Sequence, residues 1–237
     1  SDVLATDITI AGSFAVAISG TTTLTTVALD QVGFRFFENE PQSLGSGLAS
    51  VSYFGNGYAS TSADTEGVSA MALDSTNGYI YSAGNNPSIN WRIEKRRTDT
   101  GALCKGGACS AGDFDTDGVI DGVAASEYIR DIKVDATNGY IYIAGYDDSA
   151  NWRIEKRLAS TGALCTAGNC GTAFDTDGVL DGVAATNHAN NLALDISNGY
   201  IYISGDNSSF QLRIEKRLAS TGVLCTAANC GTAFDTD

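Results

Sequence analysis

The chain contains one unit of about sixty residues three times, and this internal repeat restricts the fold more than any other feature. The most similar parts of the copies are residues 74–96, 135–157 and 195–217. An Asn-Gly pair recurs within them at residues 77, 138 and 198. A fixed period of tens of residues marks a repeat architecture, so we expect three similar structural units.

The pattern inside one unit predicts four short β-strands. The first alternates apolar with polar or small residues, as at Met71 and Leu73, which is the period of a half-buried strand. The Asn-Gly pair then predicts a tight turn, because both residues tolerate the positive φ that hairpins require. A Tyr-Ile-Tyr strand follows with large side chains on both faces, and such a sheet is usually stacked between two others. The third strand is 91–96, and we expect the fourth in the cysteine loop.

The cysteines fall at one fixed place in each unit, as the pairs Cys104/Cys109, Cys165/Cys170 and Cys225/Cys230. This placement predicts three local disulfides. Zinc is the alternative, but the only histidine is His188, so a zinc site would have to join cysteines of different units. Disulfides imply an oxidising environment, and we expect a secreted, extracellular or cell-surface protein. The start at Ser1, without methionine or an apolar leader, fits a mature secreted chain.

These patterns predict an all-β fold of tandem four-stranded, propeller-like blades of about sixty residues, stapled by disulfides. The repeat region is 54–237. Its predicted units are 54–113, 114–173 and 174–233, and the motif Phe-Asp-Thr-Asp at 234–237 would begin a fourth. Residues 1–53 do not match the repeat, and we expect an N-terminal β segment there, either a cap or a strand donated to a neighbour.

The order of residues in the unit resembles the propeller-type, delta-sixty repeats of large secreted bacterial surface proteins. The resemblance covers 54–237 and is carried by Gly-Tyr-Ile-Tyr-Ile-Ala-Gly at 139–145, Trp-Arg-Ile-Glu-Lys-Arg-Leu at 152–158 and Thr-Gly-Ala-Leu at 161–164. It implies four-stranded antiparallel blades. The cysteine loop departs from that pattern, and three units are fewer than closed propellers usually have. Uncovered faces or edges would then invite another chain.

The composition excludes several partners. The net charge is −14, from 14 basic and 28 acidic residues, and so acidic a surface repels nucleic acid and anionic lipid. No apolar run approaches the length of about eighteen residues that a membrane-spanning helix needs. We therefore expect neither nucleic-acid binding nor membrane insertion.

Acidic loops after the cysteines predict calcium sites. Calcium takes six to eight oxygen ligands, and a loop with acids at alternate positions and Gly118 at the bend can wrap one ion. The pattern is incomplete, since Ala124 stands where a bidentate glutamate belongs and Ala173 replaces the first acid of the second copy. The alternative is an Asp-Gly turn that links units. The candidate ligands are Asp113, Asp115, Asp117, Asp121, Asp175, Asp177 and Asp181.

The Arg-Ile-Glu-Lys-Arg run places Arg92, Glu94 and Arg96 on one strand face, and its copies do the same. Lysine lies on the other face, at the margin of the core, where we expect Lys95 to pair with Asp74. A substrate site would be unique, whereas these charges are periodic, so we interpret them as structural. With one histidine and no nucleophile or phosphate-loop motif, the sequence does not indicate an enzyme.

The leading hypothesis is an extracellular structural or adhesive protein, a subunit of a cell-surface filament that polymerises by strand addition from the N-terminal segment. The alternative is a calcium-assisted module that binds carbohydrate or a cell surface. Its ligand site would lie in the loops that differ between units, 85–90, 146–151 and 206–211. A secreted hydrolase or lyase is the third hypothesis, and it rests on fold analogy alone.

Overall fold

The structure is a computed structural model that describes most of the repeat region. The described residues are 67–86, 90–109, 112–122, 128–147, 149–181, 188–207, 209–232 and 234, together with two short N-terminal strands. The chain divides into two compact units, Ser1–Ser50 and Val51–Asp237. In the first unit, β1 (Phe14–Val16) pairs antiparallel with β2 (Thr25–Val27). The predicted boundary at residue 53 lies outside the described residues.

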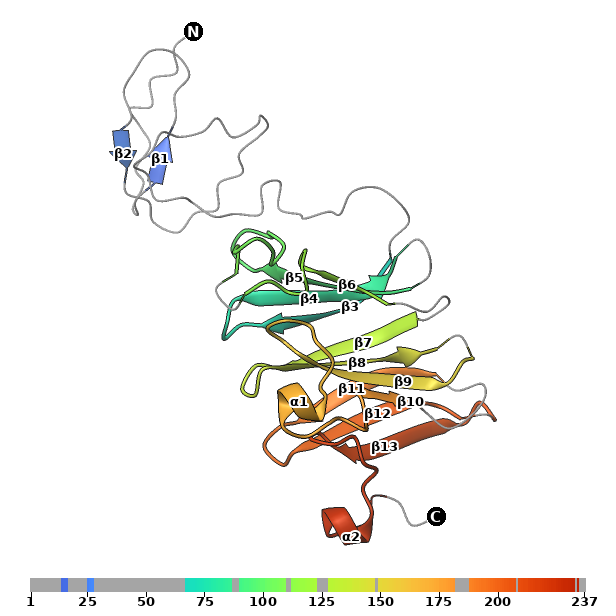
Figure 1. Ribbon diagram of the computed structural model, residues 1–237. Coiled ribbons are helices and arrows are strands. Elements are labelled where there is room, and N and C mark those ends of the chain that lie inside the picture. The colour runs from blue at the N-terminus through green and yellow to red at the C-terminus, as the bar shows by residue number, and fades with distance from the viewer. Residues whose placement is uncertain are drawn as a thin grey trace. The chain divides into compact units, whose positions relative to one another are not determined.

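The described part of the second unit consists of three antiparallel sheets (Figure 1). The first contains, in order, β3 (Gly67–Asp74), β4 (Tyr79–Asn85), β5 (Trp91–Arg97) and β6 (Val119–Asp121). The second contains β7 (Tyr128–Asp135), β8 (Tyr140–Tyr146), β9 (Trp152–Leu158) and β10 (Val179–Asp181). The third contains β11 (Ala189–Asp195), β12 (Tyr200–Asp206) and β13 (Leu212–Leu218). Only α1 (Ala167–Cys170) and α2 (Ala227–Cys230) are helical among the described residues, so the all-β class is confirmed.

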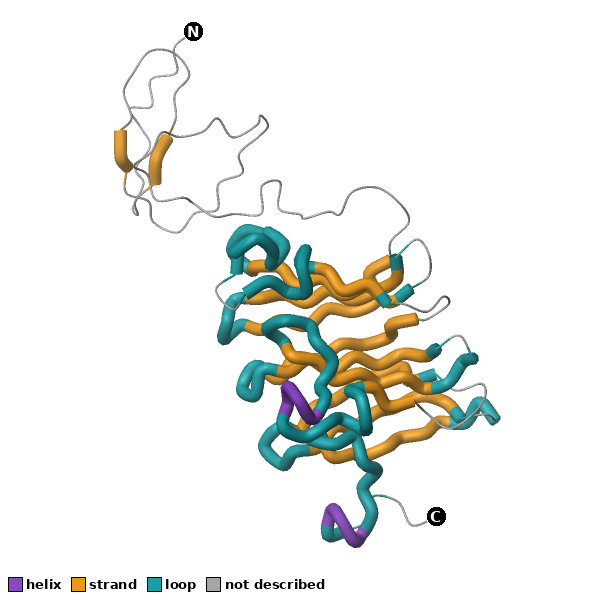
Figure 2. Tube along the Cα trace, viewed as in Figure 1, coloured by secondary structure: helices purple, strands orange, loops and turns teal. Residues whose placement is uncertain are grey.

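The three sheets lie face to face in a stack, with their loops at both ends (Figure 2). Neighbouring sheets touch most extensively through their first strands, β3 against β7 and β7 against β11. On β8, Ile141 and Ile143 pack in the core shared with the first sheet, while Tyr142 and Ala144 pack in the core shared with the third. The expectation that both faces of this strand are covered is therefore confirmed for the middle sheet. The described stack is open, since the third sheet does not return to the first.

The hairpin turns are longer than the Asn-Gly pair predicts. In the turn between β3 and β4, Gly78 takes a positive φ of 76°, and its N–H donates to the carbonyl of Asp74 at 2.9 Å. The Asp74 side chain accepts hydrogen bonds from the Asn77 N–H and Nδ2, both at 2.9 Å. The aspartate thus organises the turn, as short polar side chains often do. The prediction of a turn at this place is confirmed, and of the Asn-Gly pair only the glycine takes a positive φ.

The fourth strand lies after the cysteine loop and not within it. Val119–Asp121 pairs with β5, where Glu94 faces Val119, and β10 pairs with β9 in the same way. The cysteine loop itself makes one isolated bridge to the sheet, between Arg96 and Leu103, and then coils around its disulfide. Residues that the sequence pattern places at the start of one unit therefore complete the sheet of the preceding unit.

A β-bulge near the start of the first strand brings two backbone segments together and requires glycine. In the second sheet, the register shifts between Ile129 and Asp131. A Cβ on Gly145 would lie 1.9 Å from the carbonyl oxygen of Tyr128 and 3.0 Å from Cζ2 of Trp91, which belongs to the first sheet. The glycine therefore permits both the bulge and the close approach of the neighbouring sheet.

Candidate functional site

A buried polar contact joins neighbouring sheets of the stack. Lys95 is 1% exposed, and its Nζ donates to the carbonyl oxygen of Ala159 at 2.8 Å. The Tyr81 hydroxyl donates to the same oxygen at 2.9 Å, and Lys95 Nζ lies 4.1 Å from the ring centroid of Tyr79. We call this arrangement the lysine contact. Its counterpart between the second and third sheets consists of Lys156, Tyr142, Tyr140 and the carbonyl of Ala219.

Burial dominates the electrostatics of the lysine contact. Desolvation lowers the pKa of Lys95 to about 8, while the nearby Asp74 charge opposes this shift. The pKa of Lys156 is lowered for the same reason, and burial raises the pKa of Tyr81. The ion pair predicted between Lys95 and Asp74 is wrong, because the Asp74 carboxylate is engaged by its own turn and the lysine reaches across to the next sheet instead. Lys95 and Lys156 are also buried, whereas the sequence pattern predicted lysine at the margin of the core.

A cavity lies beside each lysine contact, at the end of the sheets that carries the Asn-Gly turns. The cavity between the first and second sheets has a volume of about 400 Å³, and the one between the second and third about 260 Å³. Corresponding residues line both: Asp74, Asn77, Tyr79 and Lys95 in one, and Asp135, Asn138, Tyr140 and Lys156 in the other. Because the cavities recur with the repeat, they follow from the packing of the sheets and do not single out one catalytic centre.

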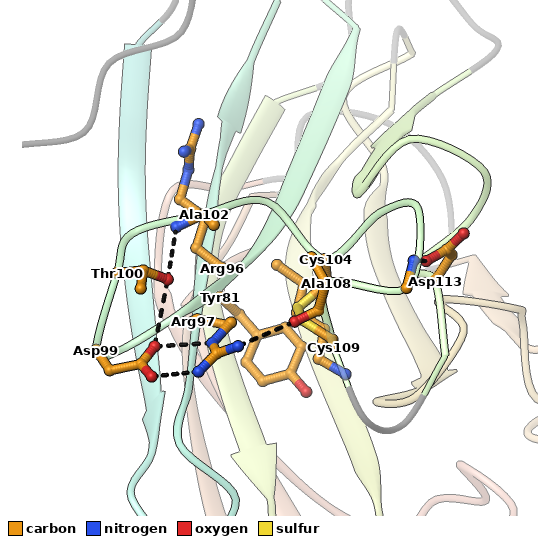
Figure 3. The surroundings of a disulfide bond; sticks show 12 residues. Tyr81, Arg96, Arg97, Asp99, Thr100, Ala102, Cys104, Ala108, Cys109 and Asp113 are labelled. Atoms are coloured by element: carbon orange, nitrogen blue, oxygen red, sulfur yellow. Dashed lines mark hydrogen bonds and ion pairs between the residues drawn. A yellow bond between two sulfur atoms is a disulfide. The ribbon is translucent and has the colours of Figure 1, made fainter. Parts of the chain in front are cut away.

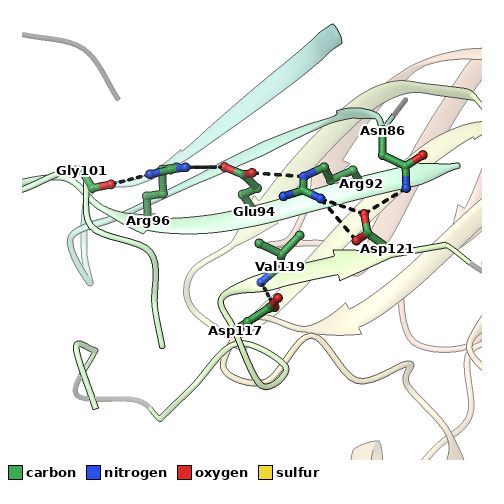
Figure 4. Close-up of polar contacts among 8 residues, drawn as sticks. All are labelled: Asn86, Arg92, Glu94, Arg96, Gly101, Asp117, Val119 and Asp121. Atoms are coloured by element: carbon green, nitrogen blue, oxygen red, sulfur yellow. Dashed lines mark hydrogen bonds and ion pairs between the residues drawn. The ribbon is translucent and has the colours of Figure 1, made fainter. Parts of the chain in front are cut away.

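The predicted arginine–glutamate face is confirmed and forms a ladder along the third strand (Figure 4). Glu94 lies between Arg92, at 3.2 Å, and Arg96, at 2.8 Å. Arg96 also donates to the carbonyl of Gly101 at 2.8 Å, which ties the following turn to the strand. The same pairs recur around Glu155 and Glu215. Each glutamate is buried and paired on both sides, so the ladder has a structural explanation.

The aspartates of the first acidic loop turn toward different partners. Asp117 accepts a hydrogen bond from the Val119 N–H at 3.0 Å, and Asp121 pairs with Arg92 at 3.2 Å (Figure 4). Asp113 accepts from the Gly107 N–H at 3.0 Å, within the cysteine loop (Figure 3). Asp115 has a positive φ of 53°. The Asp117 contact is that of an Asp-Gly turn, the alternative to a calcium loop, and the Asp121 contact is an ion pair.

The second acidic loop repeats this arrangement. Asp177 accepts from the Val179 N–H at 3.0 Å, Asp181 lies 3.6 Å from Arg153, and Asp175 has a φ of 54°. Partial burial raises the pKa of Asp181. In the described ranges no three metal-ligating side chains converge, while Ala124 lies outside them. The calcium sites therefore stay a prediction.

The three predicted disulfides are confirmed, and they close the loops Cys104–Cys109, Cys165–Cys170 and Cys225–Cys230. Around the first, Arg97 pairs with Asp99 and donates to the carbonyl of Ala108 at 3.2 Å, which holds the cysteine loop against the strand (Figure 3). Three disulfides indicate a non-reducing environment. No helix in the described ranges is long and apolar enough to cross a membrane.

A second cluster lies at the opposite end of the sheets, between the second and third. The rings of Tyr128 and Tyr146 are stacked with centroids 5.0 Å apart, and the His188 ring meets Tyr146 edge-on at 4.3 Å. Arg130 donates to the Tyr146 hydroxyl at 3.2 Å, and His188 Nδ1 lies 3.4 Å from an Asp206 carboxylate oxygen. We call Tyr128, Tyr146 and His188 the aromatic cluster.

The copies differ in chemistry at the positions of the aromatic cluster. In the first sheet, Gly67 stands at the position of Tyr128 and Asn85 at that of Tyr146, and the two are paired across β3 and β4. The first sheet forms the same strand pairing without these rings, so the fold does not demand aromatic side chains at these positions. The sequence patterns did not indicate that these three side chains meet, because Tyr128 and Tyr146 lie in different strands and His188 lies in the next unit. A position-by-position comparison of the three copies would have revealed it.

Comparison of this chain with protein-family models finds no matching family, and comparison with curated proteins finds no match. The fold and its contacts therefore define the protein at the level of class. It is an all-β repeat protein with stacked antiparallel sheets and one disulfide in each cysteine loop.

Proposed function

We propose that this protein is an extracellular structural or adhesive repeat protein that acts by self-association and has no catalytic role. The observation that carries this proposal is the lysine contact, in which the buried charge of one sheet is bound by the main chain of the next. Catalytic groups form a unique constellation, whereas these buried polar groups recur at each described interface and bond neighbouring sheets. Such groups hold neighbouring sheets together.

We further propose that the sheets are propeller-like blades related to the delta-sixty repeats. Two of the described sheets have four antiparallel strands, and the largest contact between neighbouring sheets is the one between their first strands. Blades of a propeller likewise converge through one edge toward a common axis. A stack whose ends are not joined leaves sheet faces that can associate with another molecule.

The assembly mechanism expected from the sequence is strand addition from the N-terminal segment, which satisfies main-chain hydrogen bonds between copies. Its short strands β1 and β2 pair with each other, and the segments around them lie outside the described residues. Electron microscopy and light scattering at rising protein concentration test the proposed function. Regular fibres or concentration-dependent particles support it, and a monomer at every concentration contradicts it. Deletion of residues 1–20 then tests strand addition, which requires assembly to be lost.

Calcium is proposed as a stiffening ion in the acidic loops. The melting temperature of the chain in calcium and in EDTA tests this proposal, because an ion that binds only the folded state raises stability by mass action. Asp115→Asn provides the matched variant, since Asp115 is an exposed candidate ligand. Equal melting temperatures in both buffers would contradict calcium binding by the acidic loops.

The second candidate is a module that binds a carbohydrate or a cell surface, and the aromatic cluster favours it. Partly exposed aromatic rings flanked by Arg130 and Asp206 combine an apolar surface with hydrogen-bonding groups. A glycan array with and without calcium tests this candidate. Signals that disappear in Tyr146→Ala but persist in Tyr202→Ala, at an aromatic position outside the cluster, would support it. An array without signals in both buffers would contradict it.

A further inference from the structure

The outer face of the first sheet exposes apolar side chains that are buried elsewhere in the repeat. Met71 is 69% exposed, whereas Ile132, one repeat later, is 0% exposed because it packs in the core between the first and second sheets. Val68 and Leu73 on the same strand are likewise largely exposed. In the second sheet this face covers the sheet before it, so the first sheet presents one half of an interface.

The outer face of the third sheet presents the other half. Leu212 is 77% exposed, whereas its counterpart Trp152 is 3% exposed and packs over Gly205 of the following sheet. Ile214 is also exposed, and its counterpart Ile154 is fully buried in the core between the second and third sheets. Within the described residues nothing covers this face.

The polar groups of the two outer faces are complementary as well. On the third sheet, Lys216 Nζ lies 3.7 Å from the ring centroid of Tyr200, as its counterparts do in the lysine contacts. In the described part of the chain, neither Lys216 Nζ nor the Tyr202 hydroxyl has the carbonyl acceptor that the other copies find in the next sheet. The corresponding carbonyl of the first sheet belongs to Thr98, whose N–H donates to Gly78 as that of Ala159 donates to Gly139.

We infer that a second copy of this chain stacks its first sheet on the third sheet of its neighbour. This inference rests on the proposed self-association and names its contact surface. The molecule already makes this interface twice, between its first and second and its second and third sheets, so the two outer faces continue an interface that the sequence demonstrably forms. Leu212 would pack over Gly84, and Lys216 and Tyr202 would donate to the carbonyl of Thr98.

The contact is head-to-tail, because it joins two different faces. A heterologous contact of this kind closes into a ring when the rotation between copies allows it, and otherwise extends into a fibre. Two copies carry twice the three stacked sheets of one, which is within the usual number of blades in a closed propeller. Both outcomes bury the same faces, and particle size distinguishes them.

Sedimentation velocity of four chains tests the contact: wild type, Met71→Glu, Leu212→Glu and Val223→Glu. The first two substitutions place a charge in the middle of one outer face, where exposure lets the isolated chain fold normally. Val223 is the matched control, since it is exposed and apolar but its counterparts Ala102 and Ala163 are exposed too. We expect wild type and Val223→Glu to assemble, and Met71→Glu and Leu212→Glu to remain monomeric with unchanged circular dichroism.

Mixing the two monomeric variants gives the decisive result. Met71→Glu keeps an intact third-sheet face and Leu212→Glu an intact first-sheet face, so an equimolar mixture should form a one-to-one dimer that grows no further. If both variants assemble like wild type, and especially if deletion of residues 1–20 abolishes assembly, the contact is wrong while the proposed function stands. If wild type itself stays monomeric at all concentrations, the proposed function fails and this contact fails with it.

Discussion

The ammonium group of Lys95 lies 2.8 Å from the carbonyl oxygen of Ala159, a residue 64 positions later in the chain. The Tyr81 hydroxyl shares that oxygen, so one backbone acceptor of the second sheet binds two buried donors of the first. An unsatisfied buried donor is costly, and neither donor is satisfied unless the sheets are stacked in register. The lysine contact therefore helps to define how the sheets are placed on one another.

Removing one donor of this contact should weaken the stack measurably. Tyr81→Phe deletes a buried hydrogen bond while keeping the ring, so we expect the free energy of unfolding to fall by about 1–2 kcal/mol. Tyr202→Phe is the control, because the Tyr202 hydroxyl has no such acceptor in the described part of a single chain. Urea unfolding at a concentration where the chain is monomeric measures both, and equal losses would contradict the role of the Ala159 carbonyl.

The lowered pKa of Lys95 makes stability depend on pH above neutrality. Its pKa is about 8 in the folded protein and 10.5 as the ordinary value. Between these values the unfolded chain holds a proton that the folded chain has released, so the free energy of unfolding should rise as pH increases from about 8 to 10. Below pH 8 both states are protonated, so the cost of burying the charged lysine is constant and this pH dependence is absent.

Denaturant midpoints of Lys95→Met and wild type between pH 7 and 10 check this expectation. The variant should show a smaller rise than wild type, and Lys156 should account for part of the rise that remains, because its pKa is lowered by the same cause. Lys105→Met, at an exposed lysine of the cysteine loop, should behave like wild type. Parallel pH profiles for Lys95→Met and wild type would show that the buried lysine does not titrate in this window.

The bulge glycine should tolerate no side chain. Gly145→Ala places a Cβ 1.9 Å from the Tyr128 carbonyl oxygen, and backbone must move to admit it. We expect a loss of about 3 kcal/mol or more in unfolding free energy. Gly168→Ala in α1 is the control, since its Cβ meets only Thr166 Oγ1 at 3.7 Å and the third repeat already has Ala228 there. That change should be neutral or stabilising, and thermal melting of both variants gives the comparison.

The disulfides should contribute moderately, because each closes a short loop with a sequence separation of 5. Replacing Cys165 and Cys170 by serine should lower the free energy of unfolding by about 2 kcal/mol, from the loop-closure entropy that the unfolded chain regains. Thiol labelling of the denatured, unreduced wild type should find no free cysteine. Labelled thiols at this step would contradict the disulfide assignment.

Local sequence patterns predicted much of the fold. Alternation in β3, the Asn-Gly turn and the fixed place of each cysteine pair all depend on residues close together in sequence, and their predictions of strands, turns and disulfides are confirmed. The fourth strand was misplaced because Val119–Asp121 is short and follows an acidic motif that also suits a loop. The partner of Lys95 could not be found by pairing charges, since its acceptor is a backbone carbonyl with no sequence signature.

The sequence by itself determined the repeat, the all-β class and the disulfide pairing, because each follows from spacing within one unit. Only the tertiary structure decided which faces of the sheets meet, where the fourth strand pairs and that Tyr146 lies against His188. These contacts join residues in different units, and the spacing within a unit does not indicate how far a neighbouring sheet is shifted or rotated. Packing of side chains between sheets and satisfaction of buried donors decide that relationship.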